Sequence, residues 1–71
     1  MEEISLREGD DYIKLGQLLK KANMMSSGAD AKMVILDGLV SVNGEVELRR
    51  GKKIYPGDVV TFEGESVKVV R

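Results

Sequence analysis

Hydrophobic residues follow three successive spacings along this chain, and each spacing predicts a different kind of element. The first stretch contains two short extended candidates, Ile4–Leu6 and Tyr12–Leu15, on either side of the turn-prone Glu8–Asp11. From about Gly16 the apolar positions recur at i, i+3, i+4 and i+7, which lines one side of a helix. These positions are Leu15, Leu18, Leu19 and Ala22, and the polar side carries Lys14, Gln17 and Lys21. A short amphipathic helix is therefore expected here.

A second helix is predicted to begin near Gly28 and to end at Gly38, a glycine placed for a left-handed C-cap. Ser27 and Asp30 have the S-x-x-D spacing of a capping box, in which the hydroxyl and the carboxylate each accept a hydrogen bond from a free backbone N–H. The expected core stripe is Ala31, Val34 and Ile35, widened by Met33 and Leu36. Lys32 projects at the edge of this stripe. Its stem could pack while its ammonium reaches water, or it could contact a ligand.

Beyond Gly38 the apolar spacing becomes two, which predicts strands. Val40, Val42, Val46 and Leu48 alternate around Asn43-Gly44, a residue pair typical of a two-residue hairpin turn. Tyr55–Asp58, with the sequence YPGD, fits a type II turn. Strands through Val59–Phe62 and Val67–Val70 are expected on either side of a turn at Glu63–Ser66. The predicted class is α+β, with two short helices packed on a small, mostly antiparallel sheet of four to five strands. Residues 1–71 are expected to form one domain, with an acidic segment at 1–11 and a core at 12–70.

Composition limits the chemistry that this chain can perform. It has 71 residues, near the lower limit for one core without disulfides or metal, and it contains no cysteine and no histidine. The absence of cysteine removes disulfides and thiolate metal sites and favours a reducing compartment. The absence of histidine removes the commonest general base and metal ligand. With no apolar run of about 20 residues, we expect a cytoplasmic protein that has no membrane contact, no cofactor and no enzymatic activity.

The net charge of −1 conceals an uneven distribution. Residues 1–13 hold five acids and one arginine, whereas residues 14–53 hold eight cations and four acids. Four of those cations fall within five positions, as Arg49, Arg50, Lys52 and Lys53. Such a split is typical of a polyanion-binding face. The alternative is an exposed loop whose charges keep it solvated and pair with Glu45 and Glu47.

The stretch Ala31–Gly44, AKMVILDGLVSVNG, follows the pattern A-x-x-V/L-I-x-x-G-x-V-x-V-N-G, and a G-D-x-V element follows at Gly57–Val60. Together with LGQLLKKA before it and RRGKK after it, this order resembles the S-four domain, an RNA-binding domain named after small-subunit ribosomal protein four. The similarity runs from about Tyr12 to Val70 and is greatest to the short stand-alone YaaA/YbcJ-type members. It implies the αL motif, in which the second helix and the following loop present a basic face to structured RNA.

The resemblance implies a set of RNA-binding positions. They are Lys20 and Lys21 on the first helix, Ser27, Gly28 and Lys32 on the second, and Arg49, Arg50, Lys52 and Lys53 in the loop. Many relatives carry Ser-Arg where this chain has Ser27-Gly28, so that arginine contact cannot be transferred. The free N–H groups of the helix N-terminus remain as phosphate ligands. Because aromatic residues are scarce, recognition of RNA shape and backbone is expected rather than base stacking.

The expected partner is therefore structured RNA, ribosomal or tRNA-like, bound by a monomer that could also contact a ribosomal protein. A second hypothesis is a protein-interaction module that docks a ribosomal or replication protein through its acidic N-terminal segment or through Met24-Met25. A third, an enzyme using Ser27 and Lys32, is disfavoured because helix capping already accounts for the serine.

Overall fold

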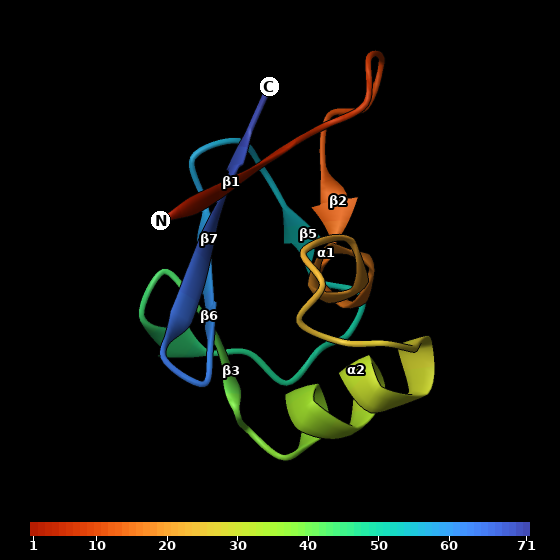
Figure 1. The fold of residues 1–71 in the computed structure, drawn as a ribbon, viewed down its shortest axis with the longest axis vertical. Helices are drawn as coiled ribbons and strands as arrows, with labels where there is room; N and C mark the ends of the chain where they lie inside the picture. Colours follow the sequence, from red (N-terminus) through yellow and green to blue (C-terminus); the bar gives the residue numbers. More distant parts are fainter.

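Two helices cover one face of the main sheet in the computed structural model, which describes all 71 residues (Figure 1). The helices are α1 (Leu15–Lys21) and α2 (Gly28–Leu36). The strands are β1 (Glu2–Ser5), β2 (Ile13–Lys14), β3 (Val40–Val42), β4 (Glu45–Val46), β5 (Lys53–Ile54), β6 (Val59–Phe62) and β7 (Glu65–Val70). The combination of two helices with these strands confirms the predicted α+β class. Neither helix has the length and apolar character that crossing a membrane requires.

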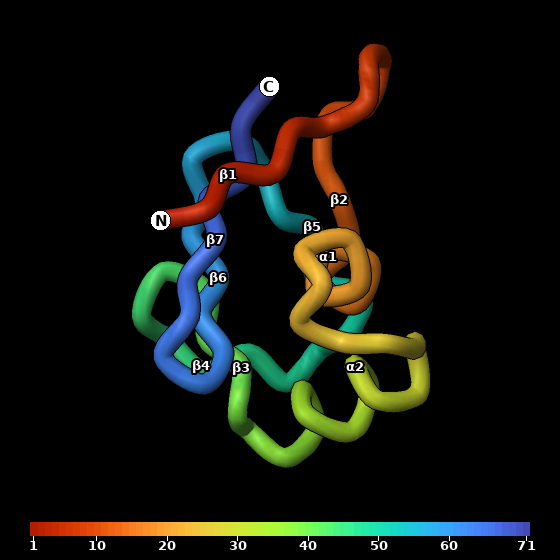
Figure 2. Tube along the Cα trace, viewed as in Figure 1, coloured from red at the N-terminus to blue at the C-terminus, as the bar shows by residue number.

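The main sheet has the strand order β1-β7-β6-β3-β4. Only β1 and β7 are parallel, and the other three pairs are antiparallel, as expected for a mostly antiparallel sheet. The first and last strands therefore lie side by side, and the tube in Figure 2 shows both chain ends at this side of the fold. Strands β2 and β5 form a separate antiparallel pair beside α1. The sequence pattern did not predict this second sheet.

The core lies between the main sheet and the helices and contains thirteen buried apolar residues. Leu15, Leu18 and Leu19 of α1 are completely buried, as their spacing predicted. Ile54 of β5 is equally buried, and it anchors the chain directly after the RRGKK loop. Burial of an aliphatic side chain of this size stabilises a fold by about 1.5–3 kcal/mol. Ile4 of β1 also belongs to the core, so the acidic first strand is part of the folded unit.

Two hairpin turns use residues with left-handed backbone conformation. Asn43 and Gly44 have φ angles of 51° and 86° between β3 and β4, which confirms the predicted two-residue turn and makes it type I′. Glu63 and Gly64 have φ angles of 52° and 79° in the same kind of turn between β6 and β7. That turn is shorter than predicted, because β7 begins at Glu65.

The predicted type II turn at Tyr55–Asp58 is also confirmed. Gly57 has a φ angle of 97°, and the Asp58 N–H donates to the Tyr55 carbonyl at 3.0 Å. The Asp58 carboxylate accepts hydrogen bonds from the Tyr55 N–H at 2.8 Å and from the Asn43 side-chain amide at 3.0 Å. These bonds connect the turn after β5 to the β3–β4 hairpin.

Helix α2 begins with the predicted serine cap, although its partner acid behaves differently. The Ser27 hydroxyl oxygen accepts from the Asp30 N–H at 3.2 Å. The Asp30 carboxylate accepts from the Ser26 hydroxyl at 3.0 Å instead of from a backbone N–H. Only the serine half of the capping box is therefore present.

At its other end α2 is closed by a Schellman motif around Gly38, which has a φ angle of 76°. The Gly38 N–H donates to the Ile35 carbonyl and the Leu39 N–H to the Val34 carbonyl, both at 3.1 Å. The predicted glycine C-cap is thus confirmed.

The predicted core stripe of α2 is confirmed, because Ala31 and Ile35 are buried and Val34 packs against the core, but its predicted widening by Met33 and Leu36 was wrong. Ala31 and Ile35 are completely buried, but Met33 and Leu36 are 62% and 60% exposed. The helix packs against α1 along the line of Ala31 and Ile35, and Leu36 lies about 100° and Met33 about 160° around the helix from that line, so both reach solvent. Leu48 was also misplaced, because β4 ends at Val46 and the chain then leaves the sheet towards α1.

Candidate nucleic-acid interface

The RRGKK loop is fixed to the N-terminal end of α1 by two backbone hydrogen bonds. The Leu15 N–H donates to the Lys52 carbonyl at 2.9 Å, and the Gly16 N–H donates to the Arg50 carbonyl at 3.1 Å. Lys14, the N-cap of α1, supplies no side-chain cap, so the loop carbonyls satisfy N–H groups that the helix itself cannot. The loop after the β3–β4 hairpin is therefore held against the first helix.

Arg50 crosses α1 directly over Gly16. A Cβ atom at position 16 would lie 2.7 Å from the Arg50 Cγ, closer than two non-bonded carbon atoms approach, so any other residue here would force the Arg50 side chain to move. Beside this crossing is a groove of about 340 Å³ between α1, the loop and the start of α2. It is lined by Lys14, Gly16, Gln17, Lys20, Gly28, Arg50 and Gly51. Three cations from distant parts of the chain thus share one groove.

A second hollow of about 510 Å³ adjoins this groove at Gly51. Arg49, Lys52, Lys53 and Tyr55 complete its lining. Lys53 lies opposite Lys14 in the β2–β5 pair, an arrangement of like charges that is unfavourable without an anion nearby. The Lys53 ammonium also lies 5.0 Å from the centre of the Tyr12 ring, a cation–π contact that holds its position.

We call this continuous surface the basic face, defined by Lys14, Lys20, Arg50, Lys52 and Lys53. The chain forms two ion pairs, one between Arg49 and Glu47 and one between Arg71 and Asp11. None of the five cations of the basic face is in either pair. Their charge is therefore available to an external anion.

Arg49 differs from its neighbours because it is paired within its own loop. Its guanidinium donates to both carboxylate oxygens of Glu47, at 3.1 and 3.2 Å, and its backbone N–H donates to the same group at 3.0 Å. These hydrogen bonds lower the pKa of Glu47 from 4.5 to about 2 and raise the pKa of Arg49. The expectation of loop charges paired with acids holds for Arg49 and Glu47, whereas Glu45 forms no ion pair.

The remaining predicted positions surround the basic face or lie beyond it. Gly28 lines the groove, next to Ser27, whose hydroxyl is occupied in capping the helix. Lys32 is exposed one turn further along α2, and so it lies on the same side of that helix as Gly28, outside the groove. Lys21 faces away from the loop, where its ammonium donates to the Ser5 carbonyl at 2.9 Å.

The N-terminus of α2 is less open to a phosphate than the sequence suggested. Asp30 is exposed in its first turn and places a carboxylate at the positive end of the helix dipole. A phosphate approaching the free N–H groups beside Gly28 would meet that negative charge. The cations of the groove are the stronger anion ligands.

Lys14 lines the groove but was not among the RNA-binding positions predicted from the sequence. The residue was assigned to the polar side of the first helix, but it lies in β2, opposite Lys53. The sequence offered one signal for this strand, the extended residues Ile13 and Lys14 before Leu15, which need a partner strand. That the partner is Lys53–Ile54 depends on the fold and is not visible in the sequence pattern.

Known proteins resemble this chain in family, sequence and structure. The S4 domain family profile matches residues 4–70. The sequence is 46% identical over 59 residues to Escherichia coli YbcJ, provisionally named an RNA-binding protein, covering 83% of this chain and 84% of YbcJ. It is 48% identical over 54 residues to RlbA of Bacillus subtilis, named a probable ribosome maturation protein, covering 76% of both chains.

The solution structure of Escherichia coli YbcJ has the same fold. It matches with a TM-score of 0.73 and 42% sequence identity, covering 100% of this chain and 89% of that protein. That structure is described as revealing an αL motif involved in RNA binding. The shared fold, the sequence identity and the near-complete family match agree with the resemblance found in AKMVILDGLVSVNG. This chain therefore belongs to the S4 domain family.

Proposed function

We propose that this chain is a non-catalytic RNA-binding protein that holds structured RNA against its basic face. The main observation is the convergence of five cations, none of them in an ion pair, from β2, α1, the loop between β4 and β5, and β5 itself. The like charges of the basic face repel one another in the free protein. A polyanion bound there attracts each of them and offsets that repulsion. The names of YbcJ and RlbA point in the same direction, and RlbA suggests ribosomal RNA as the target.

Recognition would rely on phosphate positions rather than on base identity. Arg50 can grip a phosphate with its planar fork, while the lysines act as point charges along the strand. The groove and its neighbouring hollow together follow two sides of the loop, which suits consecutive phosphates of a folded RNA. Contacts to phosphate and sugar carry little sequence information, so preference among structured RNAs should be modest.

Residues beside the basic face would have supporting roles. Lys32, Ser27 and Gly28 offer a cation and backbone N–H groups from α2 to a strand that extends past the groove. Arg49 would contribute only when RNA competes successfully with Glu47 for its guanidinium. Lys21 faces away from the loop, so it would contact only RNA that extends past Lys20 on the side away from the groove.

The proposal is tested by the salt dependence of binding to a ribosomal RNA hairpin. Replacing Arg49 and Arg50 by alanine together should weaken binding and reduce the slope of log K against log salt by about 0.7–0.9 for each phosphate that the variant no longer neutralises. A matched control is K68A/R71A, which removes the same charge from positions that line no hollow. Equal binding by the parent and the R49A/R50A variant would refute the proposed site.

A protein-docking function is the second candidate, and exposed apolar side chains favour it. Leu36, Leu39, Val46 and Leu48 are each more than half exposed. A Cβ at Gly38 would contact both Val46 and Leu48, so the end of α2 and the strand β4 form one apolar surface. Asp37, which directly follows Leu36, is exposed and forms no ion pair, and the C-terminus of α2 adds negative potential. The matching occupant is a basic segment with alternating apolar residues, of the kind that extends from ribosomal proteins.

A synthetic peptide alternating lysine and leucine tests this second candidate, with a glutamate–leucine peptide as its control. Preferential binding of the lysine peptide, lost in L36S/V46S, would support docking at this surface. Equal binding of both peptides, or self-association of the chain instead, would refute it. Met24 and Met25 are poorer docking candidates, because both are partly buried against the core.

A further inference from the structure

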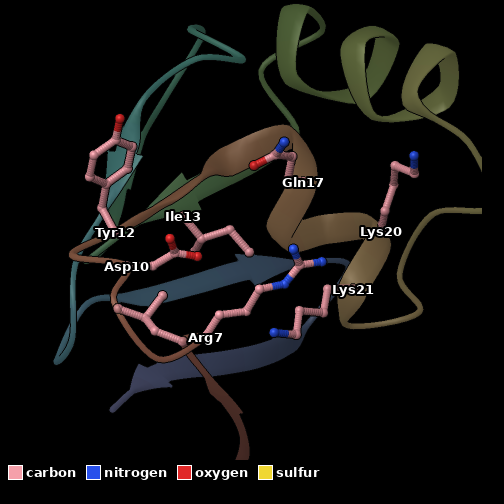
Figure 3. Close-up of a pocket in the computed structure, with 8 residues that line it drawn as sticks. Arg7, Asp10, Tyr12, Ile13, Gln17, Lys20 and Lys21 are labelled. Atoms are coloured by element: carbon pink, nitrogen blue, oxygen red, sulfur yellow. The ribbon is translucent and has the colours of Figure 1, made fainter.

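The largest hollow of the molecule lies beside the basic face, between the Leu6–Ile13 segment and α1 (Figure 3). It has a volume of about 600 Å³ and opens to solvent. A volume of 300–1,000 Å³ is typical of small-molecule sites, as an order of magnitude. We call it the N-terminal hollow. Lys20 and Lys21 of the predicted RNA-binding positions line it, but its other lining residues, such as Arg7 and Ile13, are not among those positions.

Three cations and one acid line the N-terminal hollow. The cations are Arg7, Lys20 and Lys21, and the acid is Asp10. Figure 3 shows the Arg7 and Lys21 side chains reaching towards each other beside α1, with Asp10 on the side of Ile13. None of these four groups is in an ion pair, so the hollow carries an uncompensated positive charge.

Arg7 lies in an acidic part of the sequence but next to lysines in the fold. It is the single cation among residues 1–13, which contain five acids, yet its side chain lines a hollow with two lysines. The Lys21 ammonium is held there by its hydrogen bond to the Ser5 carbonyl. Bringing a guanidinium towards a fixed ammonium costs energy unless an anion joins them.

Apolar and aromatic side chains also line the hollow, namely Leu6, Tyr12 and Ile13. Leu6 and Ile13 line it and are partly buried against the core, so they offer a fixed hydrophobic wall. A ligand that fits must therefore combine an anionic group with a flat or apolar part. A nucleotide has both, because its phosphate is anionic and its base has apolar faces.

The N-terminal hollow is also continuous with the basic face. Gln17 and Lys20 line both the hollow and the groove that contains Arg50. An RNA strand leaving the groove past Lys20 would enter the hollow next. From these observations, and resting on the proposed function, we propose that the N-terminal hollow receives one unpaired nucleotide of the bound RNA. Arg7, Lys20 and Lys21 hold its phosphate, and Leu6 and Ile13 pack against its base.

Titration of the isotopically labelled chain with uridine monophosphate tests the site directly by NMR. The expected result is a set of shifts in the amides of Leu6, Arg7, Ile13 and Gln17, larger than those caused by inorganic phosphate or by uridine at equal concentration. Shifts of equal size with phosphate would mean a simple anion site and would overturn the nucleotide assignment. An absence of shifts at these residues would overturn the site altogether.

Binding to an RNA hairpin with and without a single-stranded uridine tail separates this proposal from the proposed function. R7A should weaken binding of the tailed hairpin about five- to tenfold, as expected for one charge-assisted phosphate interaction, and leave the untailed hairpin unchanged. R50A should weaken both RNAs, and K68A is the control for loss of one charge. If R50A weakens both and R7A neither, the hollow proposal is wrong and the RNA function stands. If neither variant weakens either RNA, both proposals are wrong.

Discussion

Glu47 holds Arg49 away from any external anion, so replacing Glu47 by glutamine should make the protein bind RNA more tightly. The carboxylate accepts three hydrogen bonds from Arg49, two from the guanidinium and one from the backbone. Glutamine keeps an oxygen that can accept from the backbone N–H, so the loop conformation is retained. The guanidinium, whose side chain is 73% exposed, would lose its charged partner and become available to a phosphate.

The size of the gain follows from a single new exposed interaction. Two unit charges about 4 Å apart in water attract by about 1 kcal/mol, which corresponds to roughly fivefold in affinity. Counterion release adds a second signature, because one more neutralised phosphate steepens the slope of log K against log salt by about 0.7–0.9. E47Q should therefore bind a structured RNA about three- to fivefold more tightly at moderate salt, and the advantage should shrink as salt rises.

Fluorescence anisotropy with a labelled ribosomal RNA hairpin, measured over a series of salt concentrations, provides the assay. E45Q is the matched control, because it changes the net charge equally in a neighbouring residue that forms no ion pair. A double-mutant cycle with R49A completes the test. In the R49A background, E47Q should raise the affinity for RNA no more than E45Q does, because the arginine that Glu47 pairs with is absent. If E47Q binds no more tightly than E45Q, the view that Glu47 masks Arg49 is refuted.

Three further predictions concern acid stability, helix capping and the groove. Because the pKa of Glu47 is about 2 in the folded chain and 4.5 otherwise, its stabilising contribution is complete above pH 4.5 and is lost as the pH falls towards 2. Urea unfolding over this range should show a weaker pH dependence in E47Q, and identical slopes would contradict the pKa assignment. S27A should lower the free energy of unfolding by about 1 kcal/mol through loss of the α2 cap. S27T should restore most of it, and an unchanged urea midpoint in S27A would exclude the cap. G28R should tighten RNA binding about fivefold through one further phosphate interaction, since no atom lies within 4 Å of a Cβ there. Unchanged binding would mean that this end of the groove lies away from RNA.

Several parts of the candidate site could be anticipated from sequence because their causes are local. The cation-rich loop is readable as four charges in five positions, and the cap of α2 as a serine followed by an acid. Whether a cation is free to bind an external anion depends on contacts that the local sequence does not specify. Arg49 and Arg50 are adjacent in sequence, yet the first folds back onto Glu47 and the second crosses Gly16 of α1.

The sequence by itself determined the two helices, most strands of the main sheet and the positions of the turns. Periods of 3.6 and 2, together with Asn43-Gly44 and Gly38, define two helices and the hairpins, because backbone sterics and the burial of one face act over a few residues. It also determined the family, since AKMVILDGLVSVNG keeps both the spacing and the turn residues of the S4 domain.

Only the tertiary structure decided which side chains share a surface. Lys14 joins the basic face because β2 pairs with β5, and Met33 and Leu36 are exposed because α2 packs along one narrow line. The N-terminal hollow exists because the Leu6–Ile13 segment passes α1 without filling the space beside it. These outcomes depend on contacts between segments far apart in the chain. Local spacing constrains which face of an element is apolar, but it does not specify which other element will cover that face.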